Sequence, residues 1–367
     1  MRLLNTSTHK LSEFFGNQIP KYAILSHTWG QEEIEYRDLA GGNFTQNQGF
    51  FKLDQCCRQA FSSGYTYVWI DTCCIDKSSS AELTEAINSM CHWYQNAQVC
   101  YAFLEDVGGG DPYEDDSEFR RSRWFTRGWT LQELLFPQVV EFYDKSWKKI
   151  EFRTSPNARS RLLSEITNID PLALEDVCYA FSLPAATRIS WASNRNTTRI
   201  EDMAYCLLGL LQVNLPLLYG EGDRAFVRLQ REVISASRDT SILAWGIGQP
   251  WGDIISHTQS SSVLGRSPAD FRNAFRFSPQ QLSPRKTPKG DELHFMYTNA
   301  GLRIQLPILF IWETDMALAF LDSAWPRKLQ VRYTHHSKSV TLSTFYVAIP
   351  LERINIGGYR RLQGCSS

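Results

Sequence analysis

The first 150 residues alternate between short apolar runs and longer amphipathic segments. The apolar runs have the length and composition of buried strands, and they are Tyr22–Ser26, Tyr67–Asp71, Val99–Leu104 and Val139–Tyr143. In segments 50–63 and 79–94, apolar residues recur at the three- and four-residue intervals of a helix. Because a crossover between parallel strands returns the chain through a helix, this alternation predicts an α/β domain with a parallel sheet and flanking helices.

The pattern changes after residue 150. Asp170 followed by Pro171 indicates the start of a helix, and Thr198–Leu211 has the apolar stripe of a strongly amphipathic helix. Another helix is expected to reach Ser237, and from Ile242 onward short apolar segments separated by Pro, Gly and Ser indicate β-structure. We therefore expect three parts, which are an α/β domain over 1–150, a helical extension over 151–245 and a β-rich C-terminal region over 246–367.

Composition narrows the classes of partner. With 38 basic and 39 acidic residues the net charge is −1, which gives no reason to expect binding to nucleic acid or a membrane surface. The first residues lack the apolar core of a secretory signal, and the apolar segment 306–321 is too short and too polar to span a bilayer. The nine cysteines contain no CxxC pair and no zinc-ligand spacing. We expect a cytoplasmic protein with reduced thiols, no bound metal and no membrane span.

Polar and aromatic side chains follow the predicted strands at the points where they end. Ligands of open parallel sheets bind beyond the carboxyl ends of the strands. The side chains placed there are His27 and Trp29 after the first strand, Asp71 after the second, and Arg123 and Trp124 after the third, with Glu133 on the next helix. This convergence predicts a binding site at one edge of the sheet.

The segment Ser122–Asp144 predicts a short helix followed by a buried strand. With Leu131, Leu134 and Leu135 facing inward, Trp129 and Glu133 share the opposite face, one turn apart. A tryptophan ring beside a carboxylate suits a cleft that receives a planar, positively charged ring. The alternative is a surface glutamate next to a half-buried tryptophan.

The aromatic and basic candidates each have a structural alternative. Trp29 and Trp129 would either sandwich a nicotinamide or adenine ring or pack on the sheet edge. Arg123 and Arg127 would either clamp a pyrophosphate through paired hydrogen bonds or pair with the acidic insertion 114–118.

The candidates closest to the strand ends are also open to two interpretations. Ser26 would bond a ribose or a phosphate, His27 would contact a ligand or a loop carbonyl, and Asp71 would bond a ribose or cap its loop. Neither GxGxxG nor GxxxxGK[ST] occurs in the chain. Rossmann dehydrogenases and P-loop nucleotidases are therefore disfavoured.

Three blocks of this sequence resemble the heterokaryon-incompatibility (HET) domain of filamentous fungi. They are YAILSHTWG, VWIDTCCIDKSSSAELTEAINSM, and SRWFTRGWTLQELL followed by VVEFYD, and they stand in the family's order over about residues 20 to 148. The stretch AYCLLGLLQVNLPLLYGEGDRAF is similar to the region that often follows that domain. The resemblance implies a role in non-self recognition and regulated cell death, with self-association and an NLR-type or other incompatibility protein as partner.

The HET domain in turn resembles, more distantly, the TIR domain, which has a flavodoxin-like fold with a five-stranded parallel sheet. Many TIR domains cleave NAD⁺ at the nicotinamide–ribose bond with a glutamate on the helix after the third strand. Trp129-Thr130-Leu131-Gln132-Glu133-Leu134 fits their pattern with one extra spacer residue. The resemblance therefore implies that Glu133 is catalytic and that NAD⁺ is a substrate, with no separate cofactor.

We expect NAD⁺ hydrolysis in a cleft formed by Ser26, His27, Trp29, Asp71, Arg123, Trp129 and Glu133. One alternative is a non-enzymatic death adaptor that self-associates through its TIR-like domain, with the helices at 79–94 and 198–211 offering apolar faces. Another is an enzyme that processes a different nucleoside or nucleotide.

Overall fold

The computed structural model describes residues 1–42, 49–246 and 263–276 and, after residue 295, the strands given below together with residue 304. The chain forms two compact units. The first contains residues 1–177, 195–198 and 208–210, and the second contains residues 178–194, 199–207 and 211–367. The predicted boundaries at 150 and 245 remain predictions, although residues 151–177 pack with the first unit.

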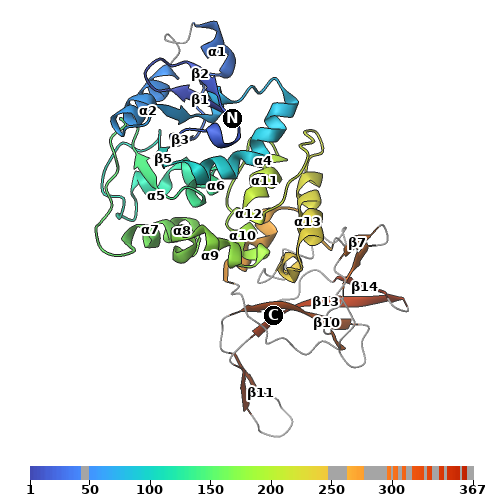
Figure 1. The fold of residues 1–367 in the computed structure, drawn as a ribbon. Coiled ribbons are helices and arrows are strands. Elements are labelled where there is room, and N and C mark those ends of the chain that lie inside the picture. Colours follow the sequence, from blue (N-terminus) through green and yellow to red (C-terminus); the bar gives the residue numbers. More distant parts are fainter. Residues whose placement is uncertain are drawn as a thin grey trace. The chain divides into compact units, whose positions relative to one another are not determined.

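A six-stranded sheet forms the centre of the first unit (Figure 1). Its order is β2-β1-β4-β3-β5-β6, with bounds Arg2–Asn5 (β1), Leu11–Glu13 (β2), Tyr22–His27 (β3), Tyr67–Trp69 (β4), Val99–Phe103 (β5) and Val140–Tyr143 (β6). Strands β4, β3, β5 and β6 are parallel, and β1 and β2 add an antiparallel hairpin at the β4 edge. The predicted α/β architecture with a parallel-rich sheet and flanking helices is confirmed.

The four parallel strands are the four that the apolar runs predict. In chain order their arrangement is 2-1-3-4, which is also the order of the first four strands of a flavodoxin-like sheet. The closer TIR-like assignment stays a prediction. The N-terminal hairpin is not predicted, because strands of three or four residues are too short to show a periodicity.

Helices of the first unit connect and cover these strands (Figure 1). Their bounds are Gly16–Gln18 (η1), Tyr36–Gly41 (α1), Phe50–Ser62 (α2), Asp71–Cys74 (α3), Ser80–Asn96 (α4), Glu118–Arg121 (α5), Arg123–Thr126 (η2), Thr130–Leu135 (α6), Ala158–Thr167 (α7) and Pro171–Glu175 (α8). The predicted helices at 50–63 and 79–94 are confirmed as α2 and α4. Asp170 caps α8 through the Leu172 N–H, as the Asp-Pro pair predicts.

Helix α4 uses its apolar face for packing. Ser79 caps its N-terminus by accepting the Glu82 N–H, and the buried residues of the helix are Ala86, Ile87, Met90, Cys91 and Tyr94. The sheet core contains further thiols, among them the buried Cys56, Cys57, Cys73 and Cys100. Burial raises the pKa of Cys57 and Cys100, so these thiols are poor nucleophiles.

The second unit contains helices followed by strands. Its helices are Ala185–Ser190 (α10), Asp202–Tyr205 (α11), Arg224–Ala236 (α13), Thr240–Leu243 (η3) and Pro268–Arg276 (η4), while Val177–Ser182 (α9) and Leu208–Leu211 (α12) cross between the units. The strands are Met296–Thr298 (β7), Gly301–Arg303 (β8), Ile308–Phe310 (β9), Met316–Trp325 (β10), Leu329–Arg332 (β11), Ser339–Leu342 (β12), Phe345–Asn355 (β13) and Gly358–Arg361 (β14). Strands β14, β13, β10 and β9 form one antiparallel sheet.

The predicted helix over 198–211 is wrong. The segment contains two short helices, α11 and α12, and Ile200 on its supposed apolar face is 52% exposed. Its first residue is held elsewhere, since Thr198 accepts a hydrogen bond from Arg127 just after the β-bridge of Asn196. A tertiary contact at the start of the segment thus competes with the helical periodicity. Among the described residues, no helix is long and apolar enough to cross a bilayer.

Gly209 of α12 lies against Cys91 of α4, and a substitution at Gly209 tests the packing between these two helices. A Cβ atom at residue 209 would lie 2.3 Å from the Cys91 Cβ, whereas one at Gly41 would have no atom within 4 Å. We expect Gly209→Ala to lower the free energy of unfolding by roughly 1–3 kcal/mol, because overpacking displaces neighbouring backbone. Gly41→Ala is the matched control and leaves stability nearly unchanged. Chemical denaturation of both variants measures the difference; equal midpoints would contradict the close approach.

Candidate functional site

Strand β3 divides the candidate site into two groups of side chains. Successive side chains of a strand point to opposite faces of the sheet. The Tyr22 hydroxyl donates to the Trp93 carbonyl of α4 (2.6 Å), so Tyr22 and, four residues later, Ser26 face α4 and α6. His27 points to the other face, which α2 covers. Ser26 and His27 are therefore adjacent in sequence but lie on opposite faces at the carboxyl end of β3.

On the first face, a chain of hydrogen bonds ends at Glu133 of α6. The Trp124 indole N–H donates to the Ser26 hydroxyl oxygen (2.9 Å), and the Ser26 hydroxyl donates to Glu133 Oε2. Ser26 and Trp124 are fully buried, and Glu133 is 7% exposed. Because the serine hydroxyl has one hydrogen, accepting from Trp124 leaves that hydrogen for Glu133. The arrangement holds the carboxyl group at the strand end.

The environment of Glu133 disfavours its charge. Burial raises its pKa to about 8 despite the Ser26 hydrogen bond, and the negative charge of Asp71 adds to the rise. The positive charges of Arg127 and Arg195 act in the opposite direction. Since a pKa of about 8 lies above neutral pH, Glu133 is mainly protonated at pH 7 in this closed arrangement.

On the second face, His27 lies between two carboxylates. Its Nδ1 is 3.8 Å from Asp71 Oδ1, and its Nε2 is 3.6 Å from Glu33 Oε2. Lys52 of α2 donates to the other oxygen of Glu33 at 2.5 Å. Burial alone would raise the pKa of Glu33, but His27 and Lys52 outweigh it and hold this pKa at about 2. Glu33 is therefore a fixed carboxylate at neutral pH.

Asp71 connects the two groups. It is the first residue of α3, directly after β4, and its Oδ2 accepts the Trp29 indole N–H at 2.8 Å. Its charge acts on both His27 and Glu133. The Trp29 ring is 46% exposed and has the Lys77 ammonium 3.7 Å from its centroid. This ring thus presents a face that already attracts a cation.

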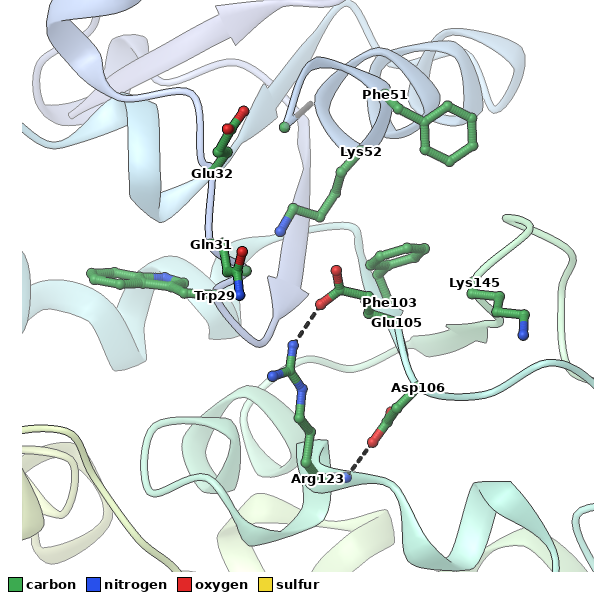
Figure 2. A pocket seen from close by; sticks show the side chains of 12 residues that line it. Trp29, Gln31, Glu32, Phe51, Lys52, Phe103, Glu105, Asp106, Arg123 and Lys145 are labelled. Atoms are coloured by element: carbon green, nitrogen blue, oxygen red, sulfur yellow. Dashed lines mark hydrogen bonds and ion pairs between the residues drawn. The ribbon is translucent and has the colours of Figure 1, made fainter. Parts of the chain in front are cut away.

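An open pocket of about 770 Å³ lies beside Trp29 at the same edge of the sheet. The loops after β3, β5 and β6, the N-terminal end of α2 and residue 123 line it. Figure 2 shows the Arg123 guanidinium paired with Glu105 in the pocket, while the Arg123 backbone N–H donates to Asp106 at 2.7 Å. Lys52 and Lys145 add two positive charges to the lining. Glu133 does not line this pocket, because the residues around it cover its carboxyl group.

The structure thus brings most of the predicted site residues together, but in two layers. Ser26, Trp124 and Glu133 form the buried layer, and His27, Trp29 and Asp71 form the second; these three sit with Arg123 near the pocket. The predicted inward face of α6 is confirmed for its three leucines, although Thr130, Gln132 and Glu133 are buried as well. The roles of all these residues in binding or catalysis stay predictions.

Arg127 and Trp129 lie at the start of α6. Arg127 donates to the Thr198 hydroxyl at 3.2 Å, and its charge reaches Glu133. Trp129 is the residue before α6 and is half-buried. Among the described residues, neither Arg123 nor Arg127 forms an ion pair with the acidic insertion 114–118, where Arg121 pairs with Asp116 instead.

Four residues of the site have no signal in the sequence. Glu33 meets His27 from a loop, and Lys52 of α2 binds Glu33. Tyr94 of α4 packs beside Glu133, and the sequence marks it only as an ordinary core aromatic. Arg195 reaches α6 from a segment that reads as a surface loop. No short motif or regular spacing connects these positions, so only the fold reveals them.

Comparison with known protein families shows which family the region around β3 to β5 resembles. Residues 22–112, which carry β3 to β5 and the Ser26, His27, Trp29 and Asp71 positions, match the family model described as "Heterokaryon incompatibility protein (HET)". This part of the chain is therefore similar to the HET family, in agreement with the resemblance of the three sequence blocks.

A curated relative is the "Vegetative incompatibility protein HET-E-1" of Podospora anserina, which is 45% identical over 225 residues. The match covers 59% of this chain and 16% of the relative, so the chain spans only a small part of that protein's length. No solved structure matches the chain.

The burial of Glu133 predicts a pH-dependent cost to stability. Its folded pKa of about 8 lies above its ordinary value of 4.5, so the protonated form favours folding and stability falls as pH rises from about 4.5 to 8. Glu133→Gln cannot ionise. We expect it to be more stable than the wild type by about 3 kcal/mol at pH 7, with the gain vanishing near pH 4.5. Denaturation of both proteins at several pH values measures this difference in stability. A gain that is constant across pH would contradict a buried Glu133 with a raised pKa.

Proposed function

We propose that this chain is a heterokaryon-incompatibility effector whose HET domain hydrolyses NAD⁺ at the nicotinamide–ribose bond. The incompatibility role is supported by the family match and by the named function of the relative. The hydrolytic role rests on the chain of hydrogen bonds from Trp124 through Ser26 to Glu133 at the carboxyl end of a parallel sheet. A cytoplasmic location would give such an effector access to its substrate.

The proposed reaction breaks the bond between C1′ of the ribose and the ring nitrogen of nicotinamide. The bonding electrons leave with the ring, so nicotinamide departs neutral and needs no general acid. Positive charge develops on the ribose, and the Glu133 carboxylate stabilises it. Water adds to C1′ and releases one proton, giving ADP-ribose. Ser26 positions the carboxylate for this step.

The second layer and the pocket supply the remaining contacts. The Trp29 ring would stack on the cationic nicotinamide, as its contact with Lys77 suggests. Arg123, with Lys52 and Lys145 nearby, would meet the pyrophosphate in the open pocket. Since Glu133 is only 7% exposed, hydrolysis needs an opened form of the edge in which its carboxyl group reaches the substrate. Approach of the cationic ring then favours the charged form of Glu133.

Self-association through the two predicted helices is a weaker explanation. The apolar face of α4 is already buried, and the segment 198–211 is not one helix. Assembly with itself or with an incompatibility partner remains a proposal for triggering the opened form rather than a replacement for catalysis.

Nicotinamide release tests the role of Glu133. The purified chain is incubated with NAD⁺, and nicotinamide is followed for the wild type, Glu133→Gln and Glu85→Gln. We expect Glu133→Gln to reduce the rate by about 100-fold or more, because it removes the charge that stabilises the ribose. Glu85 is an exposed carboxylate on α4 and provides the matched control. Equal rates in the wild type and Glu133→Gln, or no release by the wild type at any protein concentration, would contradict the proposal.

The pH profile provides a second test. The value of kcat/KM reports groups of the free enzyme, and the active form of Glu133 is the carboxylate. Because the pKa of Glu133 is about 8, we expect kcat/KM to rise about tenfold per pH unit below pH 8 and to level off above it. A profile that is flat between pH 6 and 9 would exclude Glu133 as the ionising group.

A further inference from the structure

Residues 195–198 lie outside the stretch that resembles the HET domain but complete its Glu133 region. Asn196 pairs with Arg127 as a parallel β-bridge. The Asn196 N–H donates to the Thr126 carbonyl at 2.7 Å, and the Gly128 N–H donates to the Asn196 carbonyl at 2.9 Å. This bridge fixes the loop that leads into α6. The segment belongs to the same compact unit as α6, although Arg195 and Thr130 are 65 positions apart in the chain.

Arg195 extends this attachment into the first turn of α6. One nitrogen of its guanidinium donates to the Arg127 carbonyl at 2.8 Å and to the Thr130 hydroxyl at 2.9 Å. Arg195 is 5% exposed; its bond to Thr130 is buried and its bond to Arg127 is partly buried. Thr130 begins α6 and lies three residues before Glu133, on a neighbouring position of the same helix face.

The Thr130 hydroxyl links this attachment to the other partner of Glu133. It donates to the carbonyl of Trp124, and the Trp124 indole in turn orients Ser26 toward Glu133. Arg195 therefore reaches Glu133 by two routes, through α6 and through Trp124 and Ser26. Both routes consist of buried hydrogen bonds, which hold their members in one geometry.

We infer that Arg195 is a positioning residue for Glu133, holding the first turn of α6 and supplying a buried positive charge near the carboxyl group. That Arg195 assists catalysis rests on the proposed function, whereas its effect on the position and pKa of Glu133 does not. A buried guanidinium is costly, and a neutral side chain would serve a purely structural contact better. The charge has a use here, because it favours the carboxylate form that hydrolysis requires.

Charges on several elements act on Glu133, and Arg195 counters the unfavourable ones. Burial and the charge of Asp71 on α3 raise the pKa of Glu133, whereas Ser26 on β3, Arg127 before α6 and Arg195 lower it. Tyr94 on α4 and Cys100 on β5 also face this carboxyl group, and their own pKa values are raised by its charge.

The experiment compares Arg195→Gln and Arg195→Lys with Arg199→Gln in the full chain. Arg199 is an exposed arginine four residues later and provides the matched control. Side-chain carboxyl groups are labelled with ¹³C, the Glu133 resonance is assigned by its absence in Glu133→Gln, and its pKa is measured by NMR titration. The rate of NAD⁺ hydrolysis is measured in parallel.

We expect Arg195→Gln to raise the pKa of Glu133 by about one unit, which reduces the ionised fraction and kcat/KM at pH 7 about tenfold. Arg195→Lys keeps the charge and therefore the pKa, but its flexible ammonium lacks the fixed planar N–H directions of the guanidinium, so it holds the two acceptors less firmly and kcat falls. Arg199→Gln changes neither quantity.

An unchanged Glu133 pKa in folded Arg195→Gln would overturn the inference. If that variant does not fold, Arg195→Lys decides, and a wild-type kcat together with a wild-type Glu133 resonance would overturn it. Absence of hydrolysis in the wild type would refute the proposed function alone, because the titration still shows whether Arg195 acts on Glu133.

Discussion

The desolvation of a single carboxyl group is the constraint on which this site depends. Glu133 lies in the core of an α/β domain, where its charged form is disfavoured. A helix buried on all sides carries it, the Ser26 hydroxyl holds it, and two arginines partly compensate its charge. An ordinary core position would be filled by a leucine, as its neighbours Leu134 and Leu135 are. A buried acid with so many partners marks the place where this fold gives up stability, and such places are commonly functional.

The candidate residues lie in two layers, one buried and one that reaches the surface. The buried layer sets the geometry of Glu133, while His27, Asp71 and Trp29 connect that layer to the surface and to the open pocket. The negative charge of Asp71 acts on both layers, since Asp71 lies beside His27 and also opposes the ionisation of Glu133. A movement of Asp71 would therefore change the tendency of Glu133 to ionise.

The sequence predicts the parallel strands and the edge of the sheet where the candidates gather, because buried strands and amphipathic helices leave strong periodic patterns. It does not show that Ser26 and His27 face opposite sides with different partners, since that depends on which helix covers which face. The segment 198–211 forms α11 and α12 instead of one helix, and its first residue, Thr198, is bonded to Arg127, a tertiary contact that the local pattern does not show. The contacts of Arg195 could not be predicted from the sequence for a similar reason. Its partners are distant in the chain, and a single arginine in a polar stretch belongs to no motif or periodic pattern.

The hairpin at the N-terminus has a consequence for how this domain meets other copies. Strand β2 is only three residues long and ends in Glu13, so the sheet margin beside it offers few unsatisfied backbone groups. Short, charged margins discourage the strand-to-strand polymerisation to which open sheets are prone. Extension of the sheet by strand pairing is thereby restrained on that side.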